Sequence, residues 1–227
     1  MPTLSGRGSL PRVASTIPDG FLTSARLVAG LLTSEELRER WDRESPCAGM
    51  TLGGLAHHLA DQVRVTRVFL SYPPSDAEPI GLHEHFRRCS WVHAPLDAEE
   101  HTGLRDEANA DAAGGFDALG AMVREDLEEL PAAMAAAATR TPDAVFFQWE
   151  GWTLSTRDLL VSRLVELVVH ADDLATGLDL PTPQFPDEVA LAVVDALAGI
   201  AVVKHGQTDV VRALARPQRA TGPVPAF

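Results

Sequence analysis

Apolar residues recur at helical spacing along most of the chain, and this pattern predicts a mainly α protein. The predicted helices cover about 21–41, 52–70, 116–138, 156–176, 187–204 and 208–215. In the first of them, Thr33 followed by Glu36 has the form of a capping box, which allows a break near Thr33. Pro131 is expected to kink or end the third helix. The four long helices before residue 180 favour an antiparallel four-helix bundle.

Turn-forming and capping residues mark where these helices begin and end. Ser155, followed three residues later by Asp158, predicts the N-terminal cap of the fourth helix, and Gly177 predicts its end. Residues 75–112 carry scattered prolines and histidines without periodicity. We expect a long irregular loop there, of the kind that is usually functional in a compact domain.

Composition shifts along the chain indicate three parts. Residues 1–18 are rich in Gly, Ser and Pro, and we expect a flexible leader. Residues 19–180 would form the four-helix bundle. Prolines at 181, 183 and 186 predict a stiff linker into residues 181–227, a small C-terminal helical extension.

The helix predicted over 156–176 is apolar around nearly its whole circumference, which is typical of a buried helix. A narrow polar stripe remains, made of Ser162, Arg163, Glu166, His170 and Asp173. Glu166 and His170 lie four residues apart, so their side chains lie one above the other on one face. A carboxylate and an imidazole at this spacing can bind one divalent ion. The alternative is a solvent-facing stripe in which Glu166 and Arg163 form a surface pair.

The helix predicted over 52–70 offers a third ligand. His58 lies on the edge of its apolar stripe, whereas His57 points about 100° further round, toward solvent. His58 is therefore the histidine that can face a bundle interior, although it could also be a core-edge histidine bound to a backbone carbonyl. With Glu166 and His170 it completes a His/Glu/His set. Three protein ligands with open positions are typical of a catalytic metal site.

Other histidines are weaker metal candidates. His83 and His85 flank Glu84, but an H-x-H pair could bind an ion only in an extended backbone. His93 and His101 are isolated in the irregular segment.

The two cysteines, Cys47 and Cys89, form no C-x-x-C motif, which argues against a zinc ribbon or a dithiol redox site. Cys47 could be a thiol nucleophile, but nothing near it in the sequence lowers its pKa. We expect neither cysteine to be needed for the chemistry.

Charge narrows the class of partner. The chain has 19 Lys and Arg against 32 Asp and Glu, a net charge of −13. Such an acidic surface repels phosphate backbones and anionic lipids, so we expect no nucleic-acid or membrane partner. The most apolar late stretch, 189–203, is interrupted by Asp195 and too short to span a bilayer. No apolar stretch of signal-peptide length follows the N-terminal arginines, and a cytoplasmic location is expected.

Two signatures and a softer third match lie along the chain. They are Trp41 with Ser45–Leu52 (SPCAGMTL) and Leu55–Leu59 (LAHHL), then Arg163–His170 (RLVELVVH) with Asp172–Leu174 (DDL), then His205-Gly206 with Val210–Leu214 and Phe227. These motifs resemble those of the mycothiol-dependent maleylpyruvate isomerase family, within the DinB-like bundle superfamily. The resemblance covers about residues 20–227.

The resemblance implies a DinB-like four-helix bundle with up-down-down-up topology. It implies that His58, Glu166 and His170 bind a divalent metal ion of the zinc type, and that mycothiol, a low-molecular-weight thiol, is the cosubstrate. The segment 75–112 would then shape the substrate pocket.

The expected function is metal-dependent thiol transfer. A thiol deprotonated on the metal would attack an electrophilic small molecule, as in thiol transfers of secondary metabolism. Asp173 could accept a hydrogen bond from a histidine that binds the metal, without binding the metal itself, or it could only cap the helix. Candidates for binding acidic parts of the thiol or substrate are Arg87, Arg88, Arg212 and Arg216.

Three alternatives stay open. The first is a mycothiol-dependent cis-trans isomerase of the maleylpyruvate type. The second is a metal-dependent hydrolase, in which water attacks instead of a thiol. The third is a non-catalytic metal-binding regulatory module on the same scaffold. A homodimer is the default expectation for the assembly.

Overall fold

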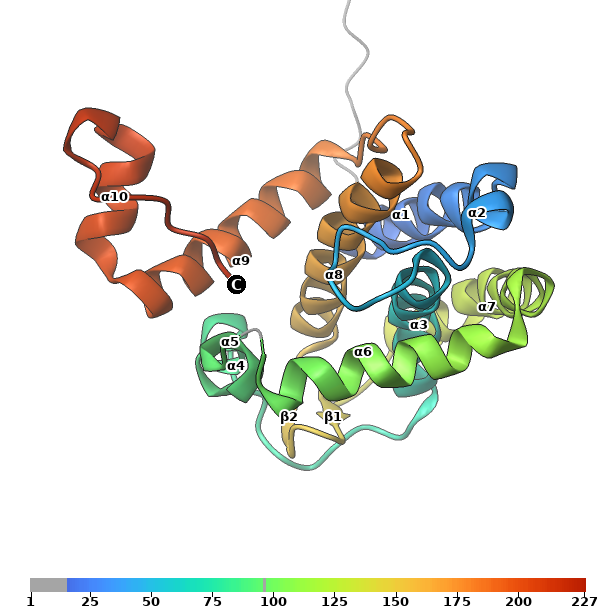
Figure 1. Cartoon of the computed structure of the whole chain (residues 1–227). Helices are drawn as coiled ribbons and strands as arrows, with labels where there is room; N and C mark the ends of the chain where they lie inside the picture. The colour runs from blue at the N-terminus through green and yellow to red at the C-terminus, as the bar shows by residue number, and fades with distance from the viewer. Residues whose placement is uncertain (1–15, 96) are drawn as a thin grey trace, which may run out of the picture.

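The computed structural model describes residues 16–95 and 97–227, which form ten α-helices, two 3₁₀ helices and one two-stranded hairpin (Figure 1). The α-helices are α1 (Ile17–Leu32), α2 (Glu35–Arg40), α3 (Leu52–Ser71), α4 (Leu82–Arg88), α5 (Ser90–His93), α6 (Glu99–Asp111), α7 (Phe116–Ala137), α8 (Thr156–Gly177), α9 (Asp187–His205) and α10 (Gln207–Ala215). The other elements are η1 (Ala112–Gly114), β1 (Val145–Phe147), β2 (Trp152–Leu154) and η2 (Pro217–Arg219). The expectation of a mainly α fold is confirmed.

Helices α1, α3, α7 and α8 form the bundle, with α3 between α7 and α8 and with α1 against both of these. Arg64 contacts Met122, and Arg67, one turn later, pairs with Asp126. Residue numbers rise in the same direction along both helices, so α3 and α7 run parallel. The long connection between them, residues 72–115, makes this possible.

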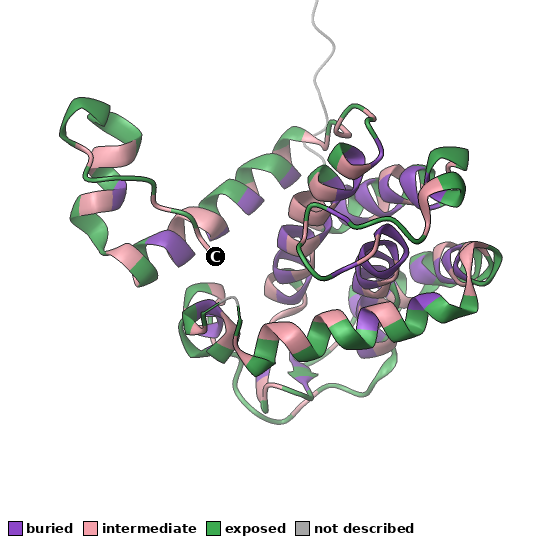
Figure 2. Ribbon diagram, viewed as in Figure 1, coloured by how far each residue is buried: buried purple, intermediate pink, exposed green. Residues whose placement is uncertain are grey.

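Helix α8 runs antiparallel to α3. His58 lies against His170, whereas Gln62, one turn later in α3, meets Arg163, about two turns earlier in α8. Buried side chains fill the space between the bundle helices, and the outer faces are exposed (Figure 2).

The first predicted helix is two helices. Ser34 caps α2 through its side chain, so the expected break near Thr33 is present with Ser34 as the cap. Arg38 in α2 pairs with Asp117 at the start of α7, which sets α1 antiparallel to α7. The bundle therefore has the up-down-down-up order of directions.

The expected leader over residues 1–18 is wrong for residues 16–18, which belong to α1 and its cap. Thr16 forms a capping box with Asp19, so α1 begins at Ile17 and includes Pro18. The rest of that expected leader, residues 1–15, lies outside the described residues.

The expectation of a long loop over 75–112 is wrong, because this segment contains α4, α5 and α6. Helix α6 lies across α3, and among its residues only Ala108 is buried. It is held by hydrogen bonds instead of an apolar face. Asn109 accepts one from the backbone N–H of Thr51 at 2.9 Å and donates one to the carbonyl of Gly49 at 2.9 Å.

The expected ends of the two later bundle helices are confirmed to within one residue. Helix α7 does not end at Pro131 but continues to Ala137, with Leu130 and Met134 on either side buried in the core. Helix α8 ends at Gly177, and the left-handed residue beyond it is Asp179, with φ of 57°.

The hairpin of β1 and β2 was not predicted, because strands of three residues are too short to show alternation. The two strands pair antiparallel, with Val145 opposite Leu154 and Phe147 opposite Trp152. Phe147 packs against Phe69 of α3, so the hairpin closes the lower end of the bundle in Figure 1.

Helices α9 and α10 form an arm that extends from the bundle (Figure 1). Helix α9 packs against α1, α4 and α8. None of the described helices is long and apolar enough to cross a membrane.

Candidate metal centre

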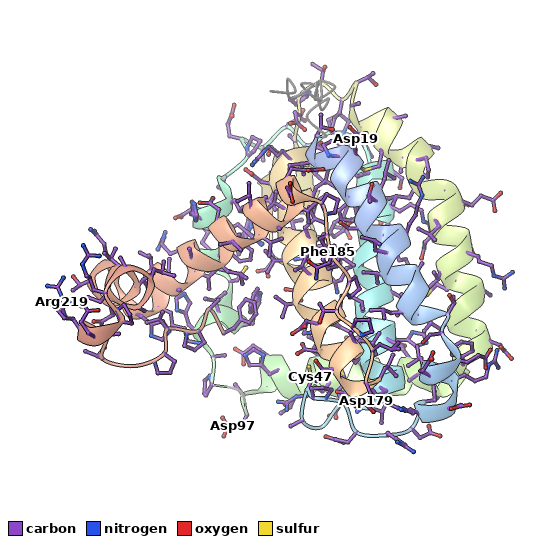
Figure 3. The ribbon with its side chains drawn as sticks, turned by 90° about the horizontal axis from the view of Figure 1, so that it is seen from above. Asp19, Cys47, Asp97, Asp179, Phe185 and Arg219 are labelled. Atoms are coloured by element: carbon purple, nitrogen blue, oxygen red, sulfur yellow. The ribbon has the colours of Figure 1, made fainter. Side chains whose placement is uncertain are left out.

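The three predicted ligands come from the two antiparallel helices α3 and α8. Thr51 caps α3, which places His58 two turns into the helix. Ser155 caps α8 as predicted, and this helix carries Glu166 and His170 on one face. Figure 3 shows Cys47, close to this site, at the same end of the bundle as Asp179 and at the opposite end from Asp19.

The structure brings His58, Glu166 and His170 together. Nε2 of His58 lies 3.5 Å from Oε2 of Glu166, and Nε2 of His170 lies 3.4 Å from the same oxygen. The two imidazole rings are nearly perpendicular, with centroids 4.9 Å apart. The exposed fractions of the three side chains are 10%, 16% and 22%, so the group is shielded from solvent without being closed to it.

These donors fit a divalent ion of the zinc type. Zn–N and Zn–O bonds of about 2.0–2.1 Å in a tetrahedral site separate neighbouring ligand atoms by about 3.3–3.4 Å. Both contacts of Glu166 are close to that separation. Nε2 of His58 is also buried without a hydrogen-bond partner, which costs free energy unless something binds it. A metal ion at this position would bind that nitrogen.

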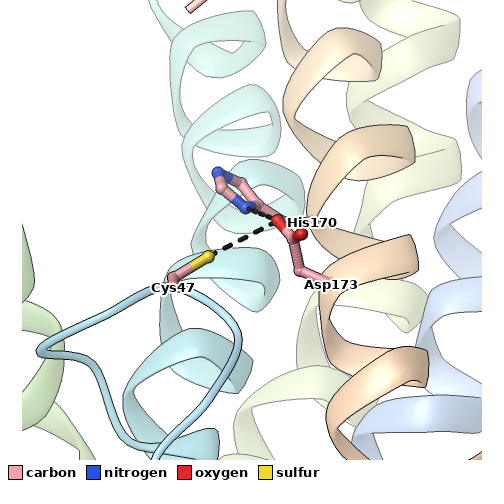
Figure 4. A group of neighbouring side chains, drawn as sticks. All are labelled: Cys47, His170 and Asp173. Atoms are coloured by element: carbon pink, nitrogen blue, oxygen red, sulfur yellow. Dashed lines mark hydrogen bonds and ion pairs between the residues drawn. The ribbon is translucent and has the colours of Figure 1, made fainter. Parts of the chain in front are cut away.

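Asp173 and Cys47 lie on the other side of the His170 ring (Figure 4). Nδ1 of His170 lies 3.0 Å from Oδ2 of Asp173, and the Cys47 thiol donates to the same oxygen at 3.4 Å. When the imidazole is neutral, this contact places the proton on Nδ1 and leaves the lone pair of Nε2 facing Glu166. Asp173 thus contacts the ring of His170, and its role as the outer partner of a ligand histidine stays a prediction. The contact of Cys47 with Asp173 was not predicted.

Electrostatics couple the carboxylate and the imidazole. Burial raises the pKa of Glu166, but the close imidazoles of His170 and His58, together with the charge of Arg163, outweigh burial and hold it well below its usual value. Burial lowers the pKa of His170, but its hydrogen bonds to Asp173, Cys47 and Glu166 outweigh that effect and raise it well above the usual value. Without a metal, the site therefore holds an ionised Glu166 beside a protonated His170.

A second group of polar side chains borders the site toward the hairpin. Arg163, one turn before Glu166 in α8, donates from Nη1 to Oε1 of Gln62 at 2.9 Å. Beyond it, Trp152 donates to Nδ1 of His85 at 3.0 Å, and burial lowers the pKa of His85 to about 3. Arg163 was predicted to lie on the polar stripe of α8, as a surface partner of Glu166 in the alternative interpretation, and no binding role was predicted for it.

Other sequence candidates lie elsewhere. His83 and His85 point apart, because they lie two residues apart on a helix: His85 is buried and His83 is exposed. His93 and His101 each contact a backbone carbonyl through Nε2. His57 is half-buried against Trp41 at a centroid distance of 6.2 Å, so its expected direction toward solvent is wrong. Helix α6 and Trp41 cover that side of α3.

The four arginines proposed for substrate or thiol binding are not joined to the site. Arg87 and Arg88 both bind the Glu84 carboxylate. Arg212 pairs with Asp209 on its own helix, and Arg216 at the end of α10 donates to the carbonyl of the residue before it. Within the described part of the chain, no hydrogen bond or ion pair links these arginines to His58, Glu166 or His170.

Only two groups of three or more potential ligands occur among the described residues: the His58, Glu166 and His170 group, and the Cys47, His170 and Asp173 group. They share His170 and use opposite nitrogens of its ring. Outside them, the described residues offer no comparable cluster.

Comparison with known proteins gives one match. The family model described as "Mycothiol maleylpyruvate isomerase N-terminal domain" matches residues 23–175, which is more than half of the chain and includes every residue of both clusters. No curated protein and no solved structure gives a match.

Proposed function

The chain belongs to the mycothiol maleylpyruvate isomerase N-terminal domain family, and on that premise we propose that it is a metal-dependent enzyme that transfers the thiol of mycothiol to an electrophilic small molecule. One observation carries the proposal. The buried, unpartnered Nε2 of His58 and the Nε2 of His170 lie against the same carboxylate oxygen of Glu166. A His/His/Glu set of this kind supplies three protein ligands and leaves a position for a further one.

Each side chain has a distinct task in this proposal. His58, Glu166 and His170 hold the ion, and Asp173 fixes the His170 ring through Nδ1. A zinc-type ion, when bound, lowers the pKa of an incoming thiol and so supplies a thiolate at neutral pH. Cys47 is engaged by Asp173 and needs no reactive role, because the reacting sulfur arrives with mycothiol.

An isomerase is the second candidate, because the family is described as one of maleylpyruvate isomerases. With a conjugated substrate, a thiolate forms a C–S bond in both reactions and shifts an electron pair onto the substrate; with an alkyl halide such as monochlorobimane, a transferase forms the C–S bond as the C–Cl bond breaks and chloride leaves. The transferase product of a conjugated substrate keeps that bond and gains a proton. In an isomerase, the former carbon–carbon double bond is single while sulfur is attached, so the substrate can rotate about it. The C–S bond then breaks and releases the thiol.

Mass spectrometry of reaction mixtures separates these candidates. Zinc-loaded protein is incubated with monochlorobimane or maleylpyruvate, with and without mycothiol. A transferase accumulates a mycothiol adduct, whereas an isomerase converts maleylpyruvate at constant mycothiol concentration. Glu166→Gln is expected to lose either activity, and His93→Gln, outside the site, to retain it. Turnover that needs no thiol would contradict the proposal and indicate a hydrolase.

A further inference from the structure

Arg163 presents a positive charge beside the proposed metal site. It lies three residues before Glu166 on α8, so the two side chains share one helix face. The charge of its guanidinium contributes to the lowered pKa of Glu166. Arg163 is half-buried, and burial lowers its own pKa, yet a guanidinium stays charged at neutral pH.

The guanidinium is held in one orientation by neutral groups. Its Nη1 donates to Oε1 of Gln62 at 2.9 Å, and Gln62 in turn donates from Nε2 to the backbone carbonyl of His58 at 2.9 Å. Its Nε donates to Oγ of Ser162 at 3.3 Å, and its central carbon lies 5.2 Å from the ring centroid of Phe147. Helix α3, helix α8 and the hairpin therefore all fix its position.

Arg163 forms no direct ion pair among the described residues, although the carboxylates of Glu166 and Glu150 lie close enough to act on its charge. Its Nη2 has no hydrogen-bond partner among the described residues. The arginines predicted from the sequence differ in this respect, because Arg87 and Arg88 already share the Glu84 carboxylate. A half-buried cation that no carboxylate contacts directly is costly. In a chain with 32 acidic residues, such a cation beside the proposed metal site is best explained by an anion that arrives as a ligand.

We propose that Arg163 is a specificity-determining residue that binds a carboxylate of the electrophilic substrate beside the metal site. The proposal rests on the proposed function for the identity of the second reactant. A guanidinium binds a planar carboxylate through parallel N–H donors, and Nη2 is the donor left for it. The enzyme then acts on electrophiles that carry a carboxylate, and it discriminates against their neutral esters.

Calorimetric titration of zinc-loaded protein with maleate, a small conjugated dicarboxylate, tests this inference. Arg163→Met is expected to weaken maleate binding at least about tenfold, because a hydrogen bond to a charged group is lost. Arg163→Lys keeps the positive charge but loses the parallel N–H donors of the guanidinium. Its affinity for maleate should therefore lie between those of the wild type and Arg163→Met. Arg124→Met, which removes an exposed arginine of α7, is the matched control and should bind maleate like the wild type.

Two further measurements separate a binding role from a structural one. Dimethyl maleate, which is neutral, should bind equally to the wild type and to Arg163→Met. Zinc content and mycothiol binding should also be unchanged in Arg163→Met. The inference would be overturned if the wild type and Arg163→Met bind maleate equally, or if the wild type does not bind maleate. The zinc and mycothiol measurements test the proposed function independently of that result. A wild type that binds neither zinc nor mycothiol would refute the proposed function instead.

Discussion

The imidazole of His170 has a different partner at each ring nitrogen. Asp173 lies at Nδ1, and Glu166 lies at Nε2. The i, i+4 spacing in α8 and the position of His58 in α3 were enough to predict that His58, Glu166 and His170 could meet, because helix geometry fixes which residues share a face. Cys47 could not be placed in the same way, because it lies in an irregular turn whose path depends on tertiary contacts.

At this scale, Asp173→Asn is expected to weaken zinc binding about 10–100-fold with the fold intact, because a carboxylate that orients a ligand histidine raises its basicity. Competition with a chromophoric chelator measures the affinity. Asp172→Asn, one residue earlier and exposed, is the matched control and should bind zinc like the wild type. Equal affinities in both variants would exclude this role for Asp173.

Zinc affinity should also depend on pH. The pKa of His170 in the metal-free protein lies well above 6.5, so the ring is protonated at neutral pH and must lose a proton when Nε2 binds a metal. Affinity should therefore rise about tenfold per pH unit until the pH reaches that pKa. Chelator competition between pH 6 and pH 8 gives the slope, and a flat profile would show that His170 binds no metal.

Among the elements, the bundle helices were predictable because each has a buried apolar face, whereas α6 was not. Helix α6 buries little apolar surface, and its position depends on hydrogen bonds of Asn109. The side-chain oxygen of Asn109 accepts from the N–H of Thr51, and its amide donates to the carbonyl of Gly49. Such contacts join residues nearly 60 positions apart and leave no periodic pattern. Gly54 permits the approach, because a Cβ there would lie 2.4 Å from Oδ1 of Asn109.

Asn109→Ala is therefore expected to lower the free energy of unfolding by about 1–1.5 kcal/mol, because the half-buried N–H of Thr51 and the carbonyl of Gly49 lose their hydrogen bonds. Urea unfolding measures the change. Hydrogen exchange should show faster exchange in residues 48–54 and in α6. The exposed Asp106→Ala, on the same helix, should change stability by less than about 0.5 kcal/mol. A loss of that small size in Asn109→Ala would mean that α6 is held in some other way.

For the whole molecule, acid stability depends on how α4 and the hairpin are joined to the bundle. His85 of α4 is buried and accepts a hydrogen bond from Trp152 of β2, and this environment holds its pKa at about 3. The unfolded chain takes up this proton near pH 6.5. The unfolded state therefore binds more protons between these values, and stability is lost as the pH falls through that window.

One such group contributes a slope of about 1.4 kcal/mol per pH unit. Urea unfolding of metal-free protein at pH 6, 5 and 4 should show that His85→Gln, which cannot titrate, has a smaller loss of stability on acidification than the wild type. The exposed His93→Gln should follow the wild-type slope. An unchanged slope in His85→Gln would show that His85 is protonated in the folded protein.

The global charge of −13 opposes any anionic substrate, so recognition of one must depend on local groups such as Arg163. The net charge was enough to predict that an anionic substrate would need local positive groups, but it could not identify Arg163 as one of them. That assignment depends on which guanidiniums are already bound to carboxylates, and only the folded chain determines this.

Metal content after purification and dialysis tests the central claim most directly. Elemental analysis should find about one equivalent of a divalent metal in the wild type and none in His170→Ala, because one of three protein ligands is lost. His93→Ala, which removes a histidine outside the cluster, should retain the wild-type content. Equal metal content in His170→Ala and the wild type would contradict the assignment of His58, Glu166 and His170 as the metal site.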